Sequence, residues 1–287
     1  MEGVKVCLVT GASSGLGRDV AFLLCEKGLR VYVSARRKEK LLSLQAECKK
    51  AGHSGEIKII DGDLSDKIFR KKLISGILKA EGKIDYLINN AGFGRAIKFE
   101  EQNSDEIEGM FKVNVVAYEH LANLVLPGMR KADSGRIINV GSVVAFTPLP
   151  YFTTYNATKA AVYMFNRSLR YELKGSKVTS TVVLPARMKT GFADKAYDCY
   201  VKDGKKVCVE IFNKAAGSSM KVARSIVRNL DSGREVVTPT FKAGLWYFMR
   251  YFGWVVDLVM KNILGPKELE HIGQTNIEEK YAKGGYM

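Results

Sequence analysis

Tyr155 and Lys159 stand four positions apart in the chain. Side chains with this spacing lie on the same face of a helix, so the ammonium group can approach the phenol. Free tyrosine has a pKa of about 10 and is a poor base at neutral pH. A fixed cation lowers that pKa towards the range in which general acid–base catalysis works best. The pair therefore suggests proton transfer, although most pairs with this spacing are surface coincidences.

A glycine-rich turn follows the first apolar run of the chain and opens an amphipathic segment. Glycines permit a tight turn from strand to helix and bring backbone N–H groups close to a pyrophosphate, which the helix N-terminus also favours. Ser13 and Ser14 could equally cap the helix, and that role is compatible with phosphate contact. The expected contacts to a dinucleotide in this turn are Gly11, Ser13, Ser14, Gly15, Leu16 and Gly17.

The end of the second expected strand bears on the choice of dinucleotide. An NAD site normally places an acidic residue here to bind the ribose hydroxyls, and Ala35 occupies that place. Arg36 and Arg37 follow and could hold a 2′-phosphate through charge-assisted hydrogen bonds. The sequence therefore favours NADP(H), while an exposed basic helix start is the simpler alternative.

These residues lie in a pattern in which short β-branched runs alternate with amphipathic segments, as in a parallel sheet covered on both faces. The expected strands are 5–10, 30–34, 56–61, 86–89, 136–142, 177–184 and 235–238. The expected helices are 15–26, 39–50, 69–80, 107–129, 154–174 and 220–229. One domain is predicted over residues 1–240, with an insertion at about 191–216 and a separate C-terminal extension over 241–287.

Composition is that of a globular protein, with 46% hydrophobic and 26% charged residues among 287. The five cysteines are scattered without metal-ligand spacing, so we expect no metal site and a reducing, cytoplasmic setting. No signal peptide is visible, because the first apolar run is short and enters a glycine turn. The net charge of +15 could favour anionic membranes, nucleic acid or phosphorylated ligands, or could simply be a solvated basic surface.

With these motifs in order, residues 4 to about 240 resemble the short-chain dehydrogenase/reductase family. The resemblance implies a Rossmann-like, doubly wound parallel sheet in three α/β/α layers, to which this chain adds a C-terminal amphipathic helical extension. It also implies NAD(P)-dependent interconversion of an alcohol and a ketone. The motifs that carry it are the glycine turn, Asp63-Leu64, Asn89-Asn90-Ala91-Gly92, Asn114, Ser142, and Tyr155 with Lys159.

The resemblance also assigns the remaining cofactor contacts. Asp63 would hydrogen-bond the adenine, with Leu64 packed beside it. The segment containing Asn90, Ala91 and Gly92 would stabilise the central sheet and let the cofactor ribose lie against the backbone. Further contacts beside the nicotinamide are implied for Pro185, Met188 and Thr190, although Ala186 replaces the family's glycine there.

In the implied chemistry, NADPH supplies the hydride, since protein side chains cannot. Tyr155 would protonate the carbonyl oxygen, and Lys159 would lower the pKa of Tyr155 and bind the nicotinamide ribose. Ser142, at the end of its strand, would stabilise charge on the substrate oxygen. Asn114 would sit in a helix and hold a water in a proton relay to Lys159; alternatively, it is a helix-interior polar residue bonded to the backbone.

The residues that flank the catalytic positions are mostly aromatic or branched, which suits a large apolar substrate among small molecules. Ordinary core packing explains any one of them equally well. The segment 192–216 lies where family members carry a mobile lid, and its lack of strong periodicity suits a loop. The candidate substrate contacts are Ser142, Phe93, Val144, Phe152 and Phe192, within a wider set that includes Val143, Phe146 and Tyr151.

Residues 241–264 are predicted to form one helix that is apolar except for a narrow stripe of Lys242, Arg250, Asp257 and Lys261. Gly265-Pro266 would end it. Four charges make a spanning helix improbable, and a helix lying in the membrane interface fits better. The alternative is a helix buried against the substrate cleft or a second subunit. Both interpretations favour lipid-like substrates.

The leading hypothesis is an NADP(H)-dependent reductase or dehydrogenase of an apolar ketone or secondary alcohol. Segments 113–116 and 141–148 are similar to 17β-hydroxysteroid-type members, although 3-ketoacyl and acyl-dihydroxyacetone-phosphate reductases share these features. A catalytically idle NADP(H) sensor or scaffold is a second hypothesis. Nucleic-acid binding is not expected, because no recognised module is present. By resemblance, we expect a homodimer or homotetramer paired through the helices that carry Asn114 and Tyr155, with possible peripheral contact to a membrane.

Overall fold

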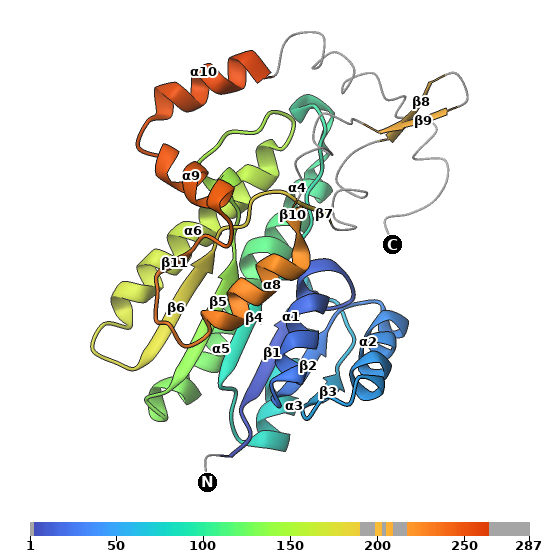
Figure 1. Cartoon of the computed structure of the whole chain (residues 1–287), viewed down its shortest axis with the longest axis vertical. Helices are drawn as coiled ribbons and strands as arrows, with labels where there is room; N and C mark the ends of the chain where they lie inside the picture. The colour runs from blue at the N-terminus through green and yellow to red at the C-terminus, as the bar shows by residue number, and fades with distance from the viewer. Residues whose placement is uncertain (1–2, 190–198, 203–204, 209–216, 264–287) are drawn as a thin grey trace.

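The computed structural model describes residues 3–189, 199–202, 205–208 and 217–263, and it contains a seven-stranded parallel sheet covered by helices on both faces (Figure 1). The strand order is β11-β6-β5-β4-β1-β2-β3, so the expected Rossmann-like, doubly wound fold is confirmed. The strands of this sheet are β1 Val6–Thr10, β2 Arg30–Ser34, β3 Glu56–Ile59, β4 Tyr86–Asn89, β5 Gly135–Val140, β6 Val178–Val183 and β11 Val236–Val237.

Two hydrophobic cores hold the three layers together. One joins the sheet to α1, α2 and α8, and the other joins it to α3, α5 and α6. The central strands are buried on both faces, which explains their nearly continuous apolar sequence. The helices that cover the sheet are α1 Gly15–Glu26, α2 Lys38–Lys50, α3 Lys67–Glu81, α5 Ala117–Lys131, α6 Thr153–Glu172 and α8 Ser219–Arg228.

The direction of winding changes at β1, and this change fixes where a ligand can bind. β1 pairs in parallel with β2 on one side and with β4 on the other. The chain therefore leaves these neighbouring strands towards opposite faces and opens a crevice at their carboxyl ends. The glycine turn after Thr10 and the segment after Asn89 both lie at this crevice.

The prediction of a single helix over 107–129 is wrong, because the structure has three successive helical segments there. The structure has α4 (Ser104–Phe111), a π-helical turn η2 (Lys112–Val116), and then α5. Asn103 caps α4 through its side chain, which accepts a hydrogen bond from the Glu106 N–H at 2.8 Å. The π-helical turn inserts one residue into the helical ladder, which a 3.6-residue hydrophobic period does not reveal.

The helix predicted over 241–264 is also wrong, because the structure divides it into α9 (Phe241–Met249) and α10 (Gly253–Ile263). Backbone bonds from Tyr251 to Phe248 and from Phe252 to Met249 turn the chain before Gly253. The Arg250 guanidinium donates to the Tyr247 carbonyl oxygen at 2.6 Å and so helps to satisfy the end of α9. The charged stripe therefore does not continue as one face, and the expected stop at 265–266 lies outside the described residues.

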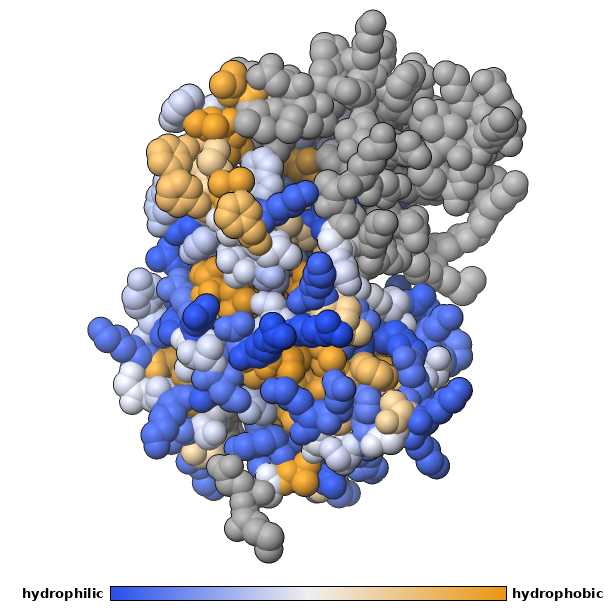
Figure 2. Space-filling view, viewed as in Figure 1, coloured by the Kyte–Doolittle hydropathy of each residue, from blue (hydrophilic) through white to orange (hydrophobic). Residues whose placement is uncertain are grey.

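Apolar side chains remain exposed on α9 and α10, and they gather at the upper left of Figure 2. Phe241 is 87% exposed and Trp254 is 70% exposed, so these helices leave an apolar face without a partner in the described part of the chain. No helix within residues 3–189 and 217–263 is both long and apolar enough to cross a membrane.

The insertion was expected to be a loop, but it contains a β-hairpin. Strand β8 (Cys199–Lys202) pairs antiparallel with β9 (Lys205–Cys208), and Cys199 lies opposite Cys208. The two strands read Cys-Tyr-Val-Lys and Lys-Lys-Val-Cys, and four positions on each side are too few for a clear period. Short strands β7 (Met188–Lys189) and β10 (Gly217–Ser218) pair in parallel where the insertion leaves and rejoins the domain.

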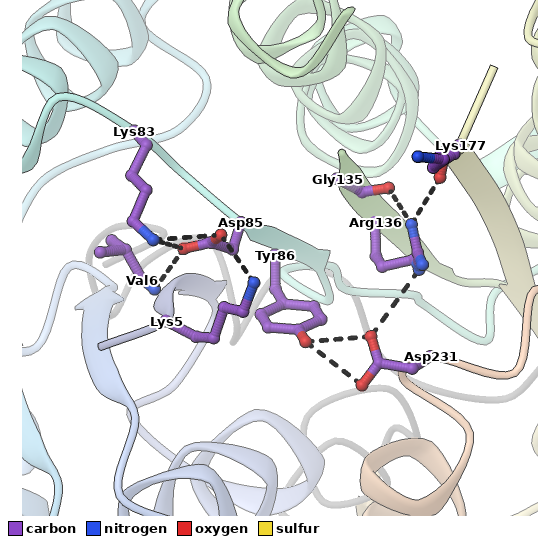
Figure 3. Close-up of polar contacts among 9 residues, drawn as sticks. All are labelled: Lys5, Val6, Lys83, Asp85, Tyr86, Gly135, Arg136, Lys177 and Asp231. Atoms are coloured by element: carbon purple, nitrogen blue, oxygen red, sulfur yellow. Dashed lines mark hydrogen bonds and ion pairs between the residues drawn. The ribbon is translucent and has the colours of Figure 1, made fainter. Parts of the chain in front are cut away.

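Polar side chains tie the opposite, amino-terminal edge of the sheet together (Figure 3). The Asp85 carboxylate accepts hydrogen bonds from the Val6 N–H at 2.8 Å and lies 3.0 Å from the Lys83 ammonium. The Tyr86 hydroxyl donates to Asp231 at 3.0 Å, which joins β4 to the turn after α8. This edge is occupied by structural contacts, so the crevice at the carboxyl edge is the place for chemistry.

Candidate active site

The glycine turn is packed against the end of β4, which explains two of its glycines. Gly11 has a φ of +69°, a conformation that other residues rarely adopt. A side chain on Gly11 would place its Cβ 2.7 Å from the Ala91 Cα, and one on Gly17 would lie 2.3 Å from the Asn90 Nδ2. These glycines therefore bring the backbone of the turn close to the crevice.

Thr10 and Asn90 lock this arrangement through hydrogen bonds between neighbouring strands. The Thr10 hydroxyl oxygen accepts from the Asn90 N–H at 2.9 Å and from the Ala91 N–H at 3.1 Å. In return, the Asn90 side-chain amide donates to the Thr10 carbonyl oxygen at 2.9 Å. The two strand ends are therefore fixed before any ligand arrives.

Arg37 lies over the turn and contacts both of its serines. Its Nη2 donates to the hydroxyl oxygens of Ser13 and Ser14, at 2.9 Å in each case. The Ser14 side chain does not cap α1, so the alternative role suggested for it is not seen. Cation, hydroxyls and helix N-terminus together form a donor set that suits phosphate groups. Arg36 beside it is exposed to solvent.

The segment after β3 contains Asp63 and Leu64. The Asp63 carboxylate is exposed and accepts from the Ser65 N–H at 2.8 Å, and Leu64 packs into the core. Buried Arg70 on α3 holds this segment, because its Nη1 donates to the carbonyl oxygens of Leu64 and Ser65 at 2.5 and 3.0 Å. Arg70 was not predicted, and a lysine-rich helix start gives no signal that distinguishes it.

Lys159 is the buried charge of the site, with 4% of its surface exposed. Its ammonium donates to the Val140 carbonyl oxygen at 2.9 Å and lies 5.6 Å from the centre of the Tyr155 ring. Burial disfavours the charged form and lowers the pKa of Lys159 from 10.5 to about 8. Tyr155 and Lys159 both belong to α6, so the expected common face is present.

Asn114 lies in the π-helical turn and is fully buried. Its side chain accepts from the Phe93 N–H at 3.0 Å and donates to the Phe93 carbonyl oxygen at 2.8 Å. It also donates to the Thr158 hydroxyl at 3.0 Å, beside Lys159. A Cβ on Gly92 would lie 2.9 Å from the Asn114 Oδ1 and 3.8 Å from the Lys159 Nζ, so this glycine leaves room between them.

Ser142 stands just beyond β5, two residues after the carbonyl that anchors Lys159. Its hydroxyl oxygen accepts from the Val144 N–H at 3.3 Å and begins a short 3₁₀ turn, η3 (Val143–Ala145). The Val143 N–H donates to the Pro185 carbonyl oxygen at 3.2 Å, which holds the ends of β5 and β6 together. Met188 follows in β7, and Thr190 lies outside the described residues.

Tyr118, Asn139 and Asn166 are buried near Lys159 and were missed by sequence reasoning, whereas Asn89 was named only as part of a motif. The ring centre of Tyr118 lies 5.6 Å from the Lys159 ammonium, and burial raises the pKa of Tyr118 well above its usual value. Behind it, Asn89 donates to Asn139 at 2.9 Å, and Asn139 donates to Asn166 at 3.1 Å, across the strands and α6. Tyr118 follows Asn114 by four positions, so helical spacing could have identified it.

The candidate substrate residues separate into exposed and buried members. Phe93 is 39% exposed, and Val144 is half-buried. Phe152 is buried beside the Tyr155 ring, with ring centres 6.0 Å apart. Phe192 lies outside the described residues. Val143 is buried in the core with Leu184, so core packing explains it.

Helix α9 packs against the turn that follows Ser142. Ala243 is fully buried against Val143, and the Phe146 and Tyr247 rings lie 5.6 Å apart. A largely apolar groove of about 550 Å³ runs along the start of this helix, lined by Thr238, Pro239, Thr240, Phe241, Gly244, Leu245 and Phe248. The extension is therefore joined to the catalytic edge of the domain.

A buried lysine beside a tyrosine, at the carboxyl edge of a doubly wound sheet with a glycine turn, defines a class of dinucleotide-dependent oxidoreductase. Residues 5–199 match the family model described as short chain dehydrogenase, more than half of the 287-residue chain. The chain belongs to the short-chain dehydrogenase/reductase family. It is accordingly an oxidoreductase that acts on CH–OH groups.

Two curated relatives illustrate the similarity. The chain is 32% identical to 11-beta-hydroxysteroid dehydrogenase-like 3 of Arabidopsis thaliana over 255 residues, 88% of this chain and 79% of the relative. It is 31% identical to 3-ketodihydrosphingosine reductase of Bacteroides thetaiotaomicron over 190 residues, 66% of each chain.

Solved structures agree with the fold. A short-chain dehydrogenase from Sphingobium yanoikuyae in complex with NADPH superposes with a TM-score of 0.75 at 26% identity, covering 90% of this chain and 96% of that one. A family member from Burkholderia phymatum in complex with NAD shares the fold, with a TM-score of 0.76 at 22% identity and coverage of 88% and 95%.

The burial of Lys159 predicts a specific pH dependence of stability in the cofactor-free protein. Its pKa in the folded chain is about 8, below the ordinary 10.5, so the unfolded chain binds more protons between these values. The free energy of unfolding attributable to Lys159 should therefore rise with pH across this window, by on the order of 3 kcal/mol. Urea unfolding measured at several pH values should show the free energy of unfolding of the wild type rising relative to that of Lys159→Met as the pH increases across this window. Parallel curves would contradict it.

Proposed function

We propose that the chain is an NADP(H)-dependent oxidoreductase that interconverts a ketone and a secondary alcohol on an apolar, steroid-like or lipid-like substrate. The observation that carries the proposal is the nearly buried Lys159 ammonium beside the Tyr155 ring. Retaining a buried cation is costly unless it has a partner or a function.

The chain's own residues can carry out the proton transfer. When bound, the dinucleotide supplies the hydride. The Tyr155 hydroxyl donates its proton to the carbonyl oxygen, and the Lys159 ammonium stabilises the resulting phenolate. The Ser142 hydroxyl donates to the same substrate oxygen and orients it. Asn114, fixed by Phe93 and Thr158, would hold a water that relays a replacement proton from solvent through Lys159 to the Tyr155 phenolate.

A preference for NADP over NAD is supported by the residues around the glycine turn. Ala35 is buried where an acidic residue would repel a 2′-phosphate, and Arg36 and Arg37 follow it. Arg37 already contacts both serines of the turn and can exchange these bonds for stronger ones to a phosphate. The Sphingobium neighbour holds NADPH, whereas the Burkholderia neighbour holds NAD.

The apolar substrate is supported by the side chains beside Tyr155 and by the relatives. Phe152 and Phe93 flank the catalytic edge, and α9 adds apolar surface next to the turn after Ser142. One relative is named for a hydroxysteroid and the other for a ketosphingoid base. A 3-ketoacyl-type or acyl-dihydroxyacetone-phosphate-type lipid reductase is the alternative. A catalytically idle NADP(H) sensor is the less favoured class, because a sensor needs no buried Lys159.

We also propose that the chain pairs with a second copy through η2 and α6. Val116 is 45% exposed, and Met164 is 56% exposed, on the elements that carry Asn114 and Tyr155. Pairing would cover these apolar side chains and would brace the helices that position the catalytic groups. Assembly of two such pairs would give a tetramer.

The exposed face of α9 and α10 supports peripheral contact with an anionic membrane. Its aromatic side chains include Phe248 and Trp254, and Tyr251 is exposed in the turn between the helices; such rings suit the interface between lipid headgroups and acyl chains. The net charge of +15 supplies attraction to anionic lipids. Such contact would place the groove beside α9 near a source of lipid-like substrate.

Replacing Tyr155 with Phe should abolish turnover and leave NADPH affinity unchanged, because only the proton donor is lost. The measurement is NADPH oxidation over sterols, ketoacyl lipids and long-chain ketones, with NADPH binding followed by fluorescence. Tyr171→Phe, which alters an exposed tyrosine on the same helix, is the matched control. Turnover retained by the Tyr155 variant would remove the assignment.

Replacing Arg36 and Arg37 together with Ala should weaken NADPH binding by about 10–100-fold, the effect of losing charge-assisted hydrogen bonds. NADH binding should stay nearly constant, since NADH has no 2′-phosphate. Arg228→Ala, an exposed arginine at the far end of α8, is the control. An equal loss for both cofactors would argue against a 2′-phosphate contact.

Membrane contact predicts co-flotation with phosphatidylserine-rich vesicles at low salt and little binding to neutral vesicles. Trp254→Ser combined with Phe248→Ser should reduce flotation strongly. Ile68→Ser, which removes a similarly exposed apolar side chain from α3, should leave flotation unchanged. If the wild type stays in the soluble fraction at low salt, the membrane proposal fails.

A further inference from the structure

Two cysteines and a histidine meet at a place remote from the catalytic edge. Cys25 lies in the last turn of α1, Cys48 lies in the last turn of α2, and His53 follows α2. Their ligand atoms, two Sγ and one imidazole nitrogen, all lie within 4.8 Å of one another. Helix α1 runs from the glycine turn at the carboxyl edge towards the opposite edge, so this cluster is separate from the dinucleotide site.

Ordinary backbone contacts hold the three residues in place. After α2, Gly52 takes a φ of +69°, and the His53 N–H donates to the Cys48 carbonyl oxygen at 3.2 Å. This bond closes a helix cap that brings the two side chains together. The Gly55 N–H donates to the Cys25 carbonyl oxygen at 3.0 Å and draws the end of α1 to the same place. The cluster is therefore preorganised by rigid elements.

The His53 imidazole has a nitrogen that the fold leaves unused. Its Nδ1 is buried and has no hydrogen-bond partner within the described residues. The imidazole ring also packs against the Phe22 ring in an edge-to-face arrangement, with ring centres 4.5 Å apart. A buried ring nitrogen without a partner costs free energy, and a metal ion would satisfy it.

We propose that Cys25, Cys48 and His53 bind a single thiophilic metal ion, with Zn²⁺ as the representative ion. Bonds of about 2.3 Å to sulfur and about 2.0 Å to nitrogen place ligand atoms roughly 3.5–4 Å apart, a small contraction from the observed cluster. Two thiolates, a neutral imidazole and a divalent cation sum to zero charge, which suits cysteines that are 1% and 3% exposed. His53 is half-buried, so a water can complete the coordination from solvent.

Metal binding must displace protons from the two thiols. Burial raises the pKa of Cys25 and, together with the neighbouring thiol, raises that of Cys48 to about 12. The Glu56 and Glu47 carboxylates act in the same direction, and Arg18 opposes them. Because the thiolate and not the thiol ligates a metal ion, binding should release protons from the cluster.

The test is a titration of the untagged, full-length, metal-free protein with Co²⁺ and then with Zn²⁺. Cys199 and Cys208 are replaced with Ser in all samples, so that these thiols cannot contribute. We expect one Co²⁺ per chain, a thiolate-to-cobalt charge-transfer band and displacement by Zn²⁺. Zn²⁺ should also raise the melting temperature, because the preformed cluster of the folded chain should bind it more tightly than the unfolded chain does.

Variants distinguish the cluster from adventitious binding. His53→Ala should weaken Co²⁺ binding by at least about tenfold, and Cys48→Ala should abolish the charge-transfer band. Cys7→Ala, which alters a buried cysteine in β1, should leave binding unchanged. NADPH binding, which uses the opposite edge, reports whether each variant is folded.

Three results would overturn the proposal. The first is the absence of a charge-transfer band in the folded wild type. The second is equal Co²⁺ affinity in the wild type and in His53→Ala. The third is a Cys25–Cys48 disulfide in protein purified without reductant, seen as a mass lower by two hydrogens, together with failure of the reduced protein to bind Co²⁺. None of these results depends on the substrate or on turnover.

Discussion

The burial of the Lys159 ammonium is the constraint around which the carboxyl edge of the sheet is arranged. A charge with 4% exposure needs fixed partners, and the carbonyl oxygen of Val140 provides one from the end of β5. The Tyr155 ring on α6 and the Tyr118 ring on α5 lie beside it, and the centre of each ring is 5.6 Å from the ammonium. Asn114 then fixes the adjoining backbone through Phe93 and Thr158. The end of β5, the π-helical turn and α6 are therefore all held in place around the Lys159 ammonium.

Much of this fold could be predicted from the sequence, because a parallel sheet buried on both faces leaves apolar runs of clear length and spacing. The first strand and helix were predicted within a residue, and the glycine turn between them has a steric requirement visible at Gly11 and Gly17. Residues placed by long-range contacts were harder. Arg70 acts through partners on another segment, so local spacing gives little indication of its burial.

The errors have physical reasons of the same kind. The hydrophobic period of the sequence continues across the break at Arg250 and so does not reveal it. The bonds that turn the chain there involve the backbone and one guanidinium group, which leave no hydrophobic pattern. The proximity of Cys25, Cys48 and His53 was not visible in the sequence, because rules for metal-ligand spacing describe ligands from one local motif. Cys25 and Cys48 come instead from the ends of two helices, and only the packing of α1 against α2 and β3 brings them together.

The π-helical turn at Lys112–Val116 also limits how this chain can change length. Such a turn accommodates one residue more than an α-helix would, so it is equivalent to a single-residue insertion kept within a helix. Deleting one residue there would restore regular α-helical pairing and rotate Asn114 by about 100° relative to Tyr118. Insertions and deletions are tolerated readily in surface loops, but in this helix they would separate the two halves of the site. The length of the segment between α4 and α5 therefore constrains the geometry of the site as much as the identity of its residues does.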